Sequence, residues 1–228
     1  MQSLTRLPFF KDVDIDYEKF DRRVAWRRCD DGETLVDFDD KSTDVYFIVS
    51  GEVRVLLRTP SGKEVILADL KSGEFFGELA AIDDIPRSAN VTALTRADLC
   101  IMPAVVFREI LFSCQTACDR VLRMLAHRVR DLNTRLAEMS IFDLRHRLYS
   151  ELLRMSHPRP GHEGMRVVSP PPFHHVLAAR IGCRREQVTR ELSSLVHEGV
   201  VEKTRGALVL AKPHVLESRL ALALAEGD

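Results

Sequence analysis

Histidine is scarce in the first 139 residues of this chain, and its scarcity excludes several kinds of site. His127 is the single histidine there, although the whole chain has 8. A jelly-roll metalloenzyme needs a cluster of histidine and carboxylate ligands on its strands, and a haem sensor would find no axial histidine inside such a domain. No serine, cysteine or histidine stands in a nucleophile-and-base arrangement. We therefore expect neither a metal site nor an enzyme.

The chain also has few cysteines and no long apolar run. Its 5 cysteines are odd in number and scattered, none forms a C-x2-C pair, and only Cys29 lies in the first 99 residues. This pattern argues against a disulfide framework and against an iron–sulfur cluster. No stretch approaches the roughly 18 uninterrupted apolar residues of a membrane helix, and the N-terminus has no apolar signal-peptide core. We expect a soluble cytoplasmic protein with reduced thiols.

Length and charge allow two domains of different character. With 228 residues, of which 45% are hydrophobic, the chain can form two cores. Residues 1–139 hold 20 Lys and Arg against 24 Asp and Glu, whereas residues 140–228 hold 13 against 10, so the net charges are −4 and +3. The small basic surplus permits a nucleic-acid partner for the second part without indicating one.

Short β-branched and aliphatic runs separated by turn residues occupy the first part. Strands of this length at roughly 8 to 12 residue spacing indicate an antiparallel barrel or sandwich, and we expect a jelly-roll-like β-roll. One turn is expected at Pro60-Ser61-Gly62. The expected strands are Val45–Val49, Val53–Leu57, Val65–Leu67 and Leu99–Met102.

The segment FGELAAIDDIPRSANV at 76–91 contains the most informative motif. A phosphate inside a β-sheet needs a fixed positive charge, hydrogen-bond donors and small neighbours. Arg87 supplies a planar fork of donors, Ser88 adds a hydroxyl, and Ala89 keeps the wall low. Glu78 would repel a phosphate but can accept a hydrogen bond from a sugar hydroxyl. The alternative is a Glu78–Arg87 surface salt bridge worth about 0 to 1 kcal/mol.

A long helical stretch follows, which no Gly or Pro interrupts from Ala104 to His157. A near-heptad stripe favours pairing with an identical helix, so we expect a parallel homodimer through a helix at about 106–139. The alternative is a helix packed on its own β-roll. The stripe consists of Cys118, Val121, Leu125, Val129, Leu132, Leu136 and Met139.

The last part shows a helix-turn-helix pattern. Apolar residues up to Ile181 predict a first helix that Gly182 ends, and residues 184–197 predict a second, whose N-terminal residues would enter the major groove. A β-hairpin wing is expected from Val200 to Leu210, with a polar turn that includes Arg205. The expected DNA-contacting residues are Arg184, Arg185, Glu186, Gln187, Thr189, Arg190 and Arg205, since such side chains recognise guanine, cytosine, thymine methyl groups or phosphate.

Together these segments resemble the family of cyclic-AMP receptor proteins and fumarate-nitrate regulators (CRP/FNR). The phosphate-binding cassette of that family is matched by Gly77, Glu78, Leu79, Pro86, Arg87, Ser88 and Ala89, and its helix-turn-helix by IGCRREQVTRELSSL. The resemblance implies an α+β fold: a cyclic-nucleotide-binding β-roll with its dimerisation helix over residues 1–139 and a winged helix-turn-helix over residues 140–228.

The resemblance also implies a function and partners. We expect a transcriptional regulator that binds a cyclic nucleotide, cyclic AMP or alternatively cyclic GMP, and binds a palindromic operator with G-containing half-sites such as TGTGA. Contact with RNA polymerase is implied as well. In the family, small hydroxyl residues of the long helix face the purine, and the aligned residues here are Leu132 and Asn133, an amide that suits either purine.

Two alternatives share these motifs. One is a family member whose pocket no nucleotide uses, and which is independent of ligand or senses another signal. The other is a cyclic-nucleotide-binding regulatory protein that does not act on transcription, although such a protein would have no use for a winged helix.

Overall fold

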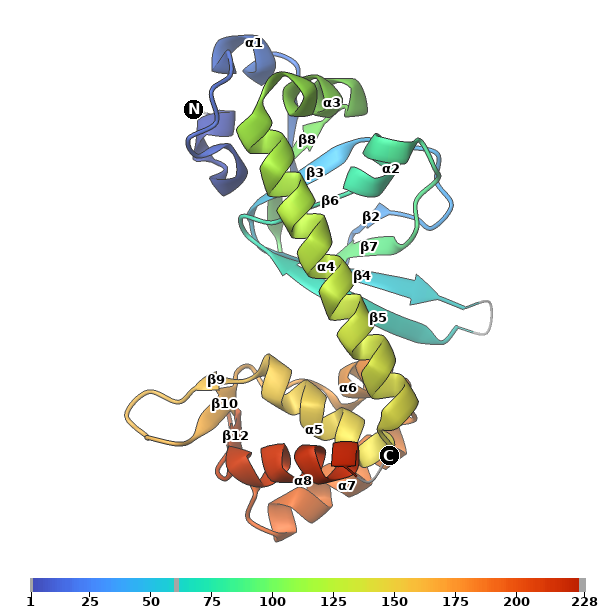
Figure 1. Ribbon diagram of the computed structural model, residues 1–228, viewed down its shortest axis with the longest axis vertical. Coiled ribbons are helices and arrows are strands. Elements are labelled where there is room, and N and C mark those ends of the chain that lie inside the picture. The colour runs from blue at the N-terminus through green and yellow to red at the C-terminus, as the bar shows by residue number, and fades with distance from the viewer. Residues whose placement is uncertain (1, 60–61, 226–228) are drawn as a thin grey trace. The chain divides into compact units, whose positions relative to one another are not determined.

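The computed structural model describes residues 2–59 and 62–225. The chain divides into two compact units, Met1–Arg128 and Val129–Asp228. The division falls inside helix α4, Gln115–Ile141 (Figure 1), whereas the sequence predicted a boundary after residue 139, which stays a prediction. The turn expected at Pro60 and Ser61 lies outside the described residues.

The first unit is a β-roll with helices at one end. Its strands form two four-stranded antiparallel sheets, in the orders β1-β8-β3-β6 and β2-β7-β4-β5. The elements are η1 (Leu4–Arg6), η2 (Pro8–Phe10), α1 (Tyr17–Asp21), β1 (Ala25–Cys29), β2 (Thr34–Val36), β3 (Val45–Ser50), β4 (Glu52–Arg58), β5 (Glu64–Lys71), β6 (Phe75–Phe76), α2 (Glu78–Asp83), β7 (Asn90–Ala93), β8 (Ala97–Met102), α3 (Ala104–Ser113) and the first part of α4.

Strand β3 shows why its sequence is apolar at nearly every position. Successive side chains of a strand point to opposite faces, and both faces of β3 are covered. Tyr46 and Ile48 belong to the core between the two sheets, while Val45 and Phe47 belong to a second core shared with α3, α4 and the N-terminal helices. The strands expected near residues 45, 53, 65 and 99 are present as β3, β4, β5 and β8.

The stretch expected as one helix at about 106–139 consists of two helices. Helix α3 ends at Ser113, and Cys114 has extended backbone angles before α4 begins. Cys114 is buried in the same core as Phe107 and Ile110 of α3 and Ala117 of α4. Burying apolar residues from both helices against the roll requires a change of direction, and this tertiary demand outweighs the absence of Gly and Pro.

The apolar stripe of α4 is divided between two environments. Val121 is buried and Leu125 packs partly against the core of the first unit. The next four stripe residues are each more than half exposed: Val129, Leu132, Leu136 and Met139. Packing on the β-roll, which the sequence left as an alternative, therefore describes the start of the stripe, and the exposed remainder is an apolar strip on the second part of the helix.

The second unit is a winged helix-turn-helix around one core. Helix α4 ends at Ile141, and Asp143 begins the next helix by accepting a hydrogen bond at Oδ1 from the backbone N–H of His146 at 3.0 Å. The sheet order is β11-β12-β10-β9. The further elements are α5 (Leu144–Met155), β9 (His157–Pro158), β10 (Arg166–Val168), α6 (His174–Ile181), α7 (Arg185–His197), β11 (Val201–Lys203), β12 (Leu208–Leu210) and α8 (Pro213–Ala225).

The predicted α+β fold, with a β-roll, a long helix and a winged helix-turn-helix, is confirmed. Among the residues that the structure describes, no helix is both long and apolar enough to cross a membrane. In the same residues, no group of three or more His, Cys, Asp or Glu side chains is arranged to hold a metal ion.

Candidate functional site

Gly77 positions the cassette that the sequence singled out. It lies between β6 and α2 with a left-handed φ of 86°, a conformation that favours glycine. A Cβ atom there would lie 2.6 Å from the carbonyl oxygen of Asp44 and 2.7 Å from Nη1 of Arg87. Glycine is therefore required both by the turn and by the close approach of the Arg87 guanidinium.

Arg87 is a buried cation with neutral partners. Only 4% of the residue is exposed, and its guanidinium donates to Ser42 Oγ at 3.1 Å, to the Gly77 carbonyl at 3.1 Å and to the Asp44 carbonyl at 2.8 Å. The guanidinium also lies 5.7 Å from the centre of the Tyr46 ring. A buried positive charge without a carboxylate among its hydrogen-bond partners is a place where an anion is favoured.

Glu78 is buried too, but it does not pair with Arg87. It is 3% exposed, and its Oε1 accepts a hydrogen bond from Nη1 of Arg128 at 2.5 Å. Arg128 lies on α4 and also donates through Nη2 to the Phe75 carbonyl at 3.0 Å. The surface salt bridge between Glu78 and Arg87 is thus not formed. Within the described chain, Oε2 of Glu78 makes no hydrogen bond, so it can accept one from a hydroxyl group.

The remaining cassette residues line the same segment. Leu79 is 46% exposed on α2, and Ala89 is buried beside Arg87. Ser88 is exposed. The structure therefore brings Gly77, Glu78, Leu79, Arg87, Ser88 and Ala89 together in one unit.

The predicted base-facing residues lie elsewhere in the chain. Leu132 and Asn133 are exposed residues of α4 within the second compact unit. Their contact with a ligand stays a prediction. Arg128, by contrast, was not expected from the sequence, because it is separated from Glu78 by 50 residues and stands among several arginines of the same helix.

The helix-turn-helix is built as the sequence predicted. Helix α6 ends at Ile181 and is capped by Gly182, which adopts a left-handed φ of 72° and donates its N–H to the Ala178 carbonyl. Helix α7 follows after Arg184, whose backbone N–H donates to Oε1 of Gln187 at 3.0 Å. Val188, Leu192 and Leu195 bury one face of α7 in the core of the second unit.

The opposite face of α7 is polar and open. Arg185, Glu186 and Arg190 are exposed, and their side chains make no hydrogen bond or ion pair with the part of the chain that the structure describes. The ordinary helix-surface pair of Glu186 with Arg190, which is possible at this spacing, is therefore absent there. Gln187 is half-buried because its amide caps the helix, so its amide oxygen is already used.

The hydroxyl of Thr189 is also used inside the protein. Its Oγ1 donates to the Arg185 carbonyl at 3.0 Å and lies 2.7 Å from Nδ1 of His174 on α6. Burial, together with nearby Lys203 and Arg185, lowers the pKa of His174 from its ordinary value. His174 was not assigned a role from the sequence, because a histidine at a helix start is more often exposed to solvent.

The wing adjoins this contact. Strands β11 and β12 pair antiparallel from Val201 to Leu210, and Arg205 is exposed in the turn between them. Residues of the wing, of α6 and of α7 border a cavity of about 210 Å³. Its lining consists of Pro171, Pro172, His174, Leu192, Lys203, Thr204, Ala207 and Leu208.

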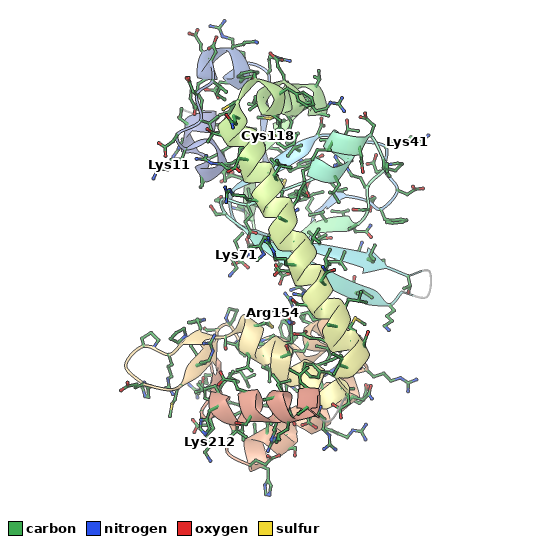
Figure 2. The ribbon with its side chains drawn as sticks, viewed as in Figure 1. Lys11, Lys41, Lys71, Cys118, Arg154 and Lys212 are labelled. Carbon is green, nitrogen blue, oxygen red and sulfur yellow. The ribbon has the colours of Figure 1, made fainter. Side chains whose placement is uncertain are left out.

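A series of linked ion pairs connects α4 with the helix-turn-helix within the second unit. Arg154 of α5, labelled in Figure 2, donates to Oε1 of Glu138 on α4 at 2.6 Å and to Oε2 of Glu151 at 2.5 Å. Oε1 of Glu151 accepts from Nη1 of Arg180 on α6 at 3.2 Å. Since Glu151 is 1% exposed, breaking these ion pairs would leave a buried charge without a partner.

Comparison with known proteins agrees with the folds of both the β-roll and the winged helix-turn-helix. Residues 26–114 match the Cyclic nucleotide-binding domain family, and residues 146–219 match the Crp-like helix-turn-helix domain family. These two matches lie on the roll that holds Arg87 and on the unit that holds α7. The chain belongs to the CRP/FNR family. It is a DNA-binding transcriptional regulator that carries a cyclic-nucleotide-binding domain, and it is not an enzyme.

Curated members of the CRP/FNR family match along most of their length. The cyclic AMP receptor protein of Thermus thermophilus is 29% identical over 210 residues, covering 91% of each chain. The CRP-like cAMP-activated global transcriptional regulator of Mycobacterium tuberculosis is 26% identical over 189 residues, covering 82% of this chain and 84% of the relative. The regulator Vfr of Pseudomonas aeruginosa is 27% identical over 212 residues, covering 88% and 94%.

Solved structures of the family share the fold. A CooA mutant from Carboxydothermus hydrogenoformans superposes with a TM-score of 0.77 at 19% identity, covering 91% of this chain and 92% of that one. A CRP/FNR-family protein from Eubacterium rectale superposes with a TM-score of 0.72 at 20% identity, covering 95% and 99%. At these identities, the likeness concerns the fold of the family.

Proposed function

We propose that this regulator binds cyclic AMP in its β-roll, with cyclic GMP as the second candidate. In this proposal Arg87 neutralises the cyclic phosphate, Ser88 donates its hydroxyl to a phosphate oxygen, and Glu78 accepts a hydrogen bond from the ribose. Gly77, Leu79 and Ala89 shape the wall, and Leu132 and Asn133 meet the base. The cAMP-activated relatives favour the adenine nucleotide.

One observation carries the proposal: the buried guanidinium of Arg87 has only neutral hydrogen-bond partners. These partners use one hydrogen each, so two of the five guanidinium N–H groups remain for an anion. Glu78 adds a free carboxylate oxygen, Oε2, in the same cassette. A ligand with both a phosphodiester and a sugar hydroxyl can accept hydrogen bonds from Arg87 and donate one to Glu78. Inorganic phosphate has no sugar hydroxyl to offer to Glu78.

A second candidate function is tested as well, because Arg87 and Glu78 already have hydrogen-bond partners within the protein. Arg87 is held by two backbone carbonyls and a hydroxyl, and Glu78 is held by Arg128. These contacts keep the cassette ordered by the protein itself. In this second reading, the regulator binds DNA without a nucleotide, or in response to another signal.

Calorimetric titration separates the two candidates. The purified chain is titrated with cyclic AMP, cyclic GMP and cyclic di-GMP, each with and without operator DNA. Saturable binding of cyclic AMP, tighter in the presence of DNA, supports the proposal, since coupling between two ligands is reciprocal. Absence of heat with all three nucleotides, while the chain still binds DNA, supports the nucleotide-independent function.

We further propose that two chains pair through α4 and read a palindromic operator. The support is the exposed apolar strip at Val129, Leu132, Leu136 and Met139 and the exposed polar face of α7. A symmetric dimer would place two α7 helices about 34–36 Å apart, in successive major grooves. Contact with RNA polymerase is proposed from the family relationship alone.

Sedimentation measures the dimer directly. A double variant, Leu132→Glu with Leu136→Glu, places two charges in the strip and is expected to sediment as a monomer at concentrations where the original chain is a dimer. Leu222→Glu, at an exposed leucine of α8, serves as the control. If the α4 variant remains a dimer, pairing uses another surface.

A further inference from the structure

The hydrogen bond between His174 and Thr189 fixes which nitrogen of the histidine carries a proton. Thr189 gives its hydroxyl hydrogen to the Arg185 carbonyl at 3.0 Å. The 2.7 Å contact between Thr189 Oγ1 and His174 Nδ1 is then a hydrogen bond that Nδ1–H donates. In the neutral ring, Nε2 is therefore unprotonated and cannot donate to an anion. Protonation of the ring takes place at Nε2.

Positive charges surround this ring from two other elements. Arg185 belongs to the first turn of α7, and Lys203 belongs to the wing strand β11. Both lower the pKa of His174, after the larger effect of burial. On α6 itself the neighbouring titratable group is His175, which is exposed. His174 of α6, Arg185 of α7 and Lys203 of β11 are thus three groups that can carry a positive charge near the start of α7.

The cavity next to the His174 ring is too small for a whole ligand molecule but large enough for a single chemical group. At about 210 Å³ it lies below the roughly 300–1,000 Å³ of pockets that enclose whole small molecules. His174 and Lys203 supply its charge. The hydroxyl of Thr204 already donates to the Ala207 carbonyl at 2.9 Å, and most of the remaining lining is apolar. A single phosphate of a DNA backbone is the ligand that fits this size, this charge and the neighbourhood of α7, because most protein–DNA hydrogen bonds go to phosphate and sugar.

We propose that His174 and Lys203 bind one DNA backbone phosphate, and that His174 takes up a proton from solvent when it does so. The proposal rests on the proposed DNA-binding function of α7. Without DNA, Lys203 and Arg185 oppose protonation of the ring. A phosphate between them reverses the local field, so Nε2 gains a proton and donates to a phosphate oxygen.

The direction of the pH dependence follows. The pKa of His174 is low in the free protein and higher in the complex, so the complex holds more protons at pH values between the two. Affinity for DNA then rises as pH falls through that window. It stays constant above the pKa of the complex and below that of the free protein.

Fluorescence anisotropy on the full chain provides the test. One labelled duplex carries two inverted TGTGA half-sites centred about 10 base pairs apart, and a second duplex of equal length has a scrambled sequence. Binding is followed from about pH 8 to about pH 5.5 at constant ionic strength. A phosphate contact reads no sequence, so the slope of log Kd against pH should appear with both duplexes, at no more than about one per ring.

Four variants separate a proton-linked contact from a structural role. His174→Gln should remove the slope and weaken binding several-fold at low pH. His174→Lys carries a permanent charge and should bind tightly at every pH, which a merely structural histidine does not predict. Thr189→Val removes the bond that holds the ring and should reduce the slope. His175→Gln, the matched control on the same helix, should keep the slope of the original chain.

The outcomes distinguish proton uptake by His174 from DNA binding itself. Circular dichroism melting first shows that each variant folds. If His174→Gln keeps the original slope, or if the original chain binds both duplexes without pH dependence, the proposed proton uptake is wrong while DNA binding stands. If neither duplex is bound at any pH, with or without cyclic AMP, both proposals fail. Competition by inorganic phosphate at millimolar levels that abolishes the slope without weakening DNA binding would assign the cavity to a free anion instead.

Discussion

Arginine is used in opposite ways in the two units of this chain. Arg87 of the first unit is 4% exposed and fixed by three hydrogen bonds. Arg185 and Arg190 of the second unit are exposed, and their side chains have no partner in the described chain. A small ligand supplies few contacts, so its site must be ordered and shielded from water in advance. A DNA duplex supplies many contacts, and side chains that move freely can adapt to it.

The two sites also differ in what the protein loses when the arginine is removed. Removing Arg87 takes the guanidinium donor away from Ser42 and from the Asp44 carbonyl, and it leaves the cassette without its positive charge. Removing the Arg185 side chain breaks no hydrogen bond or ion pair within the described chain. The comparison therefore predicts large and local effects in the first unit and smaller, sequence-dependent effects in the second.

Arg87→Leu should produce the largest effect. We expect affinity for cyclic AMP to fall by about 100-fold or more, which corresponds to about 2.7 kcal/mol, because the charged hydrogen bonds to the phosphate are lost. Calorimetric titration measures the affinity. Arg96→Leu is the matched control, since Arg96 belongs to an exposed ion pair with Asp30 in the same unit and such pairs contribute little. Unchanged affinity in Arg87→Leu would place the phosphate elsewhere.

Arg128→Met tests the partner that the cassette recruits from α4. Glu78 would be left buried without its cation, a change that costs about 3–5 kcal/mol for a fully buried pair. Because about a third of the Arg128 side chain is exposed, we expect a loss of about 2 kcal/mol in the free energy of unfolding. Urea unfolding measures it. The double variant Glu78→Gln with Arg128→Met should recover part of the lost stability. If Arg128→Met alone is as stable as the original chain, the Glu78–Arg128 pair does not stabilise the fold.

The sequence predicted the parts of both sites that are local in the chain. The cassette residues are close together in sequence, so the motif alone predicted that one segment carries them, although it did not predict the short helix α2. The turn glycine Gly182 and the polar start of α7 are likewise contiguous. The position of β3 was also predicted from a short apolar run, because burial on both faces leaves few polar positions, whereas the order of the strands in the sheets was not predicted.

Contacts between distant segments were not visible in the sequence. Arg128 meets Glu78 across 50 residues, and the hydroxyl of Thr189 is used by His174 rather than left for DNA. The break at Cys114 was missed for a related reason. No local signal marks it, because the change of direction is imposed by packing against the roll and not by Gly or Pro.

Arg185→Ala should have a smaller effect that depends on the DNA sequence. An arginine that contacts guanine bidentately discriminates by about 1 to 3 kcal/mol, so we expect about 10-fold weaker binding to a TGTGA duplex, or about 1.4 kcal/mol, and little change with a duplex in which the guanines are replaced. Anisotropy on both duplexes measures the ratio. Lys212→Ala removes one exposed charge from the same unit and should leave the ratio intact. A uniform loss in Arg185→Ala would make it a phosphate contact.

Arg205→Ala should have the smallest effect and a different signature. Arg205 is exposed in the turn of the wing, where a cation meets phosphate rather than base edges. Its removal should weaken binding to every duplex by about three-fold near physiological salt and lower the slope of log K against log salt by about 1. Lys41→Ala, an exposed charge of the first unit, is the control and should leave the slope unchanged. A change in sequence preference without a change in the salt slope would show instead that the wing contacts bases, and that exposed arginines of the second unit read DNA from two elements.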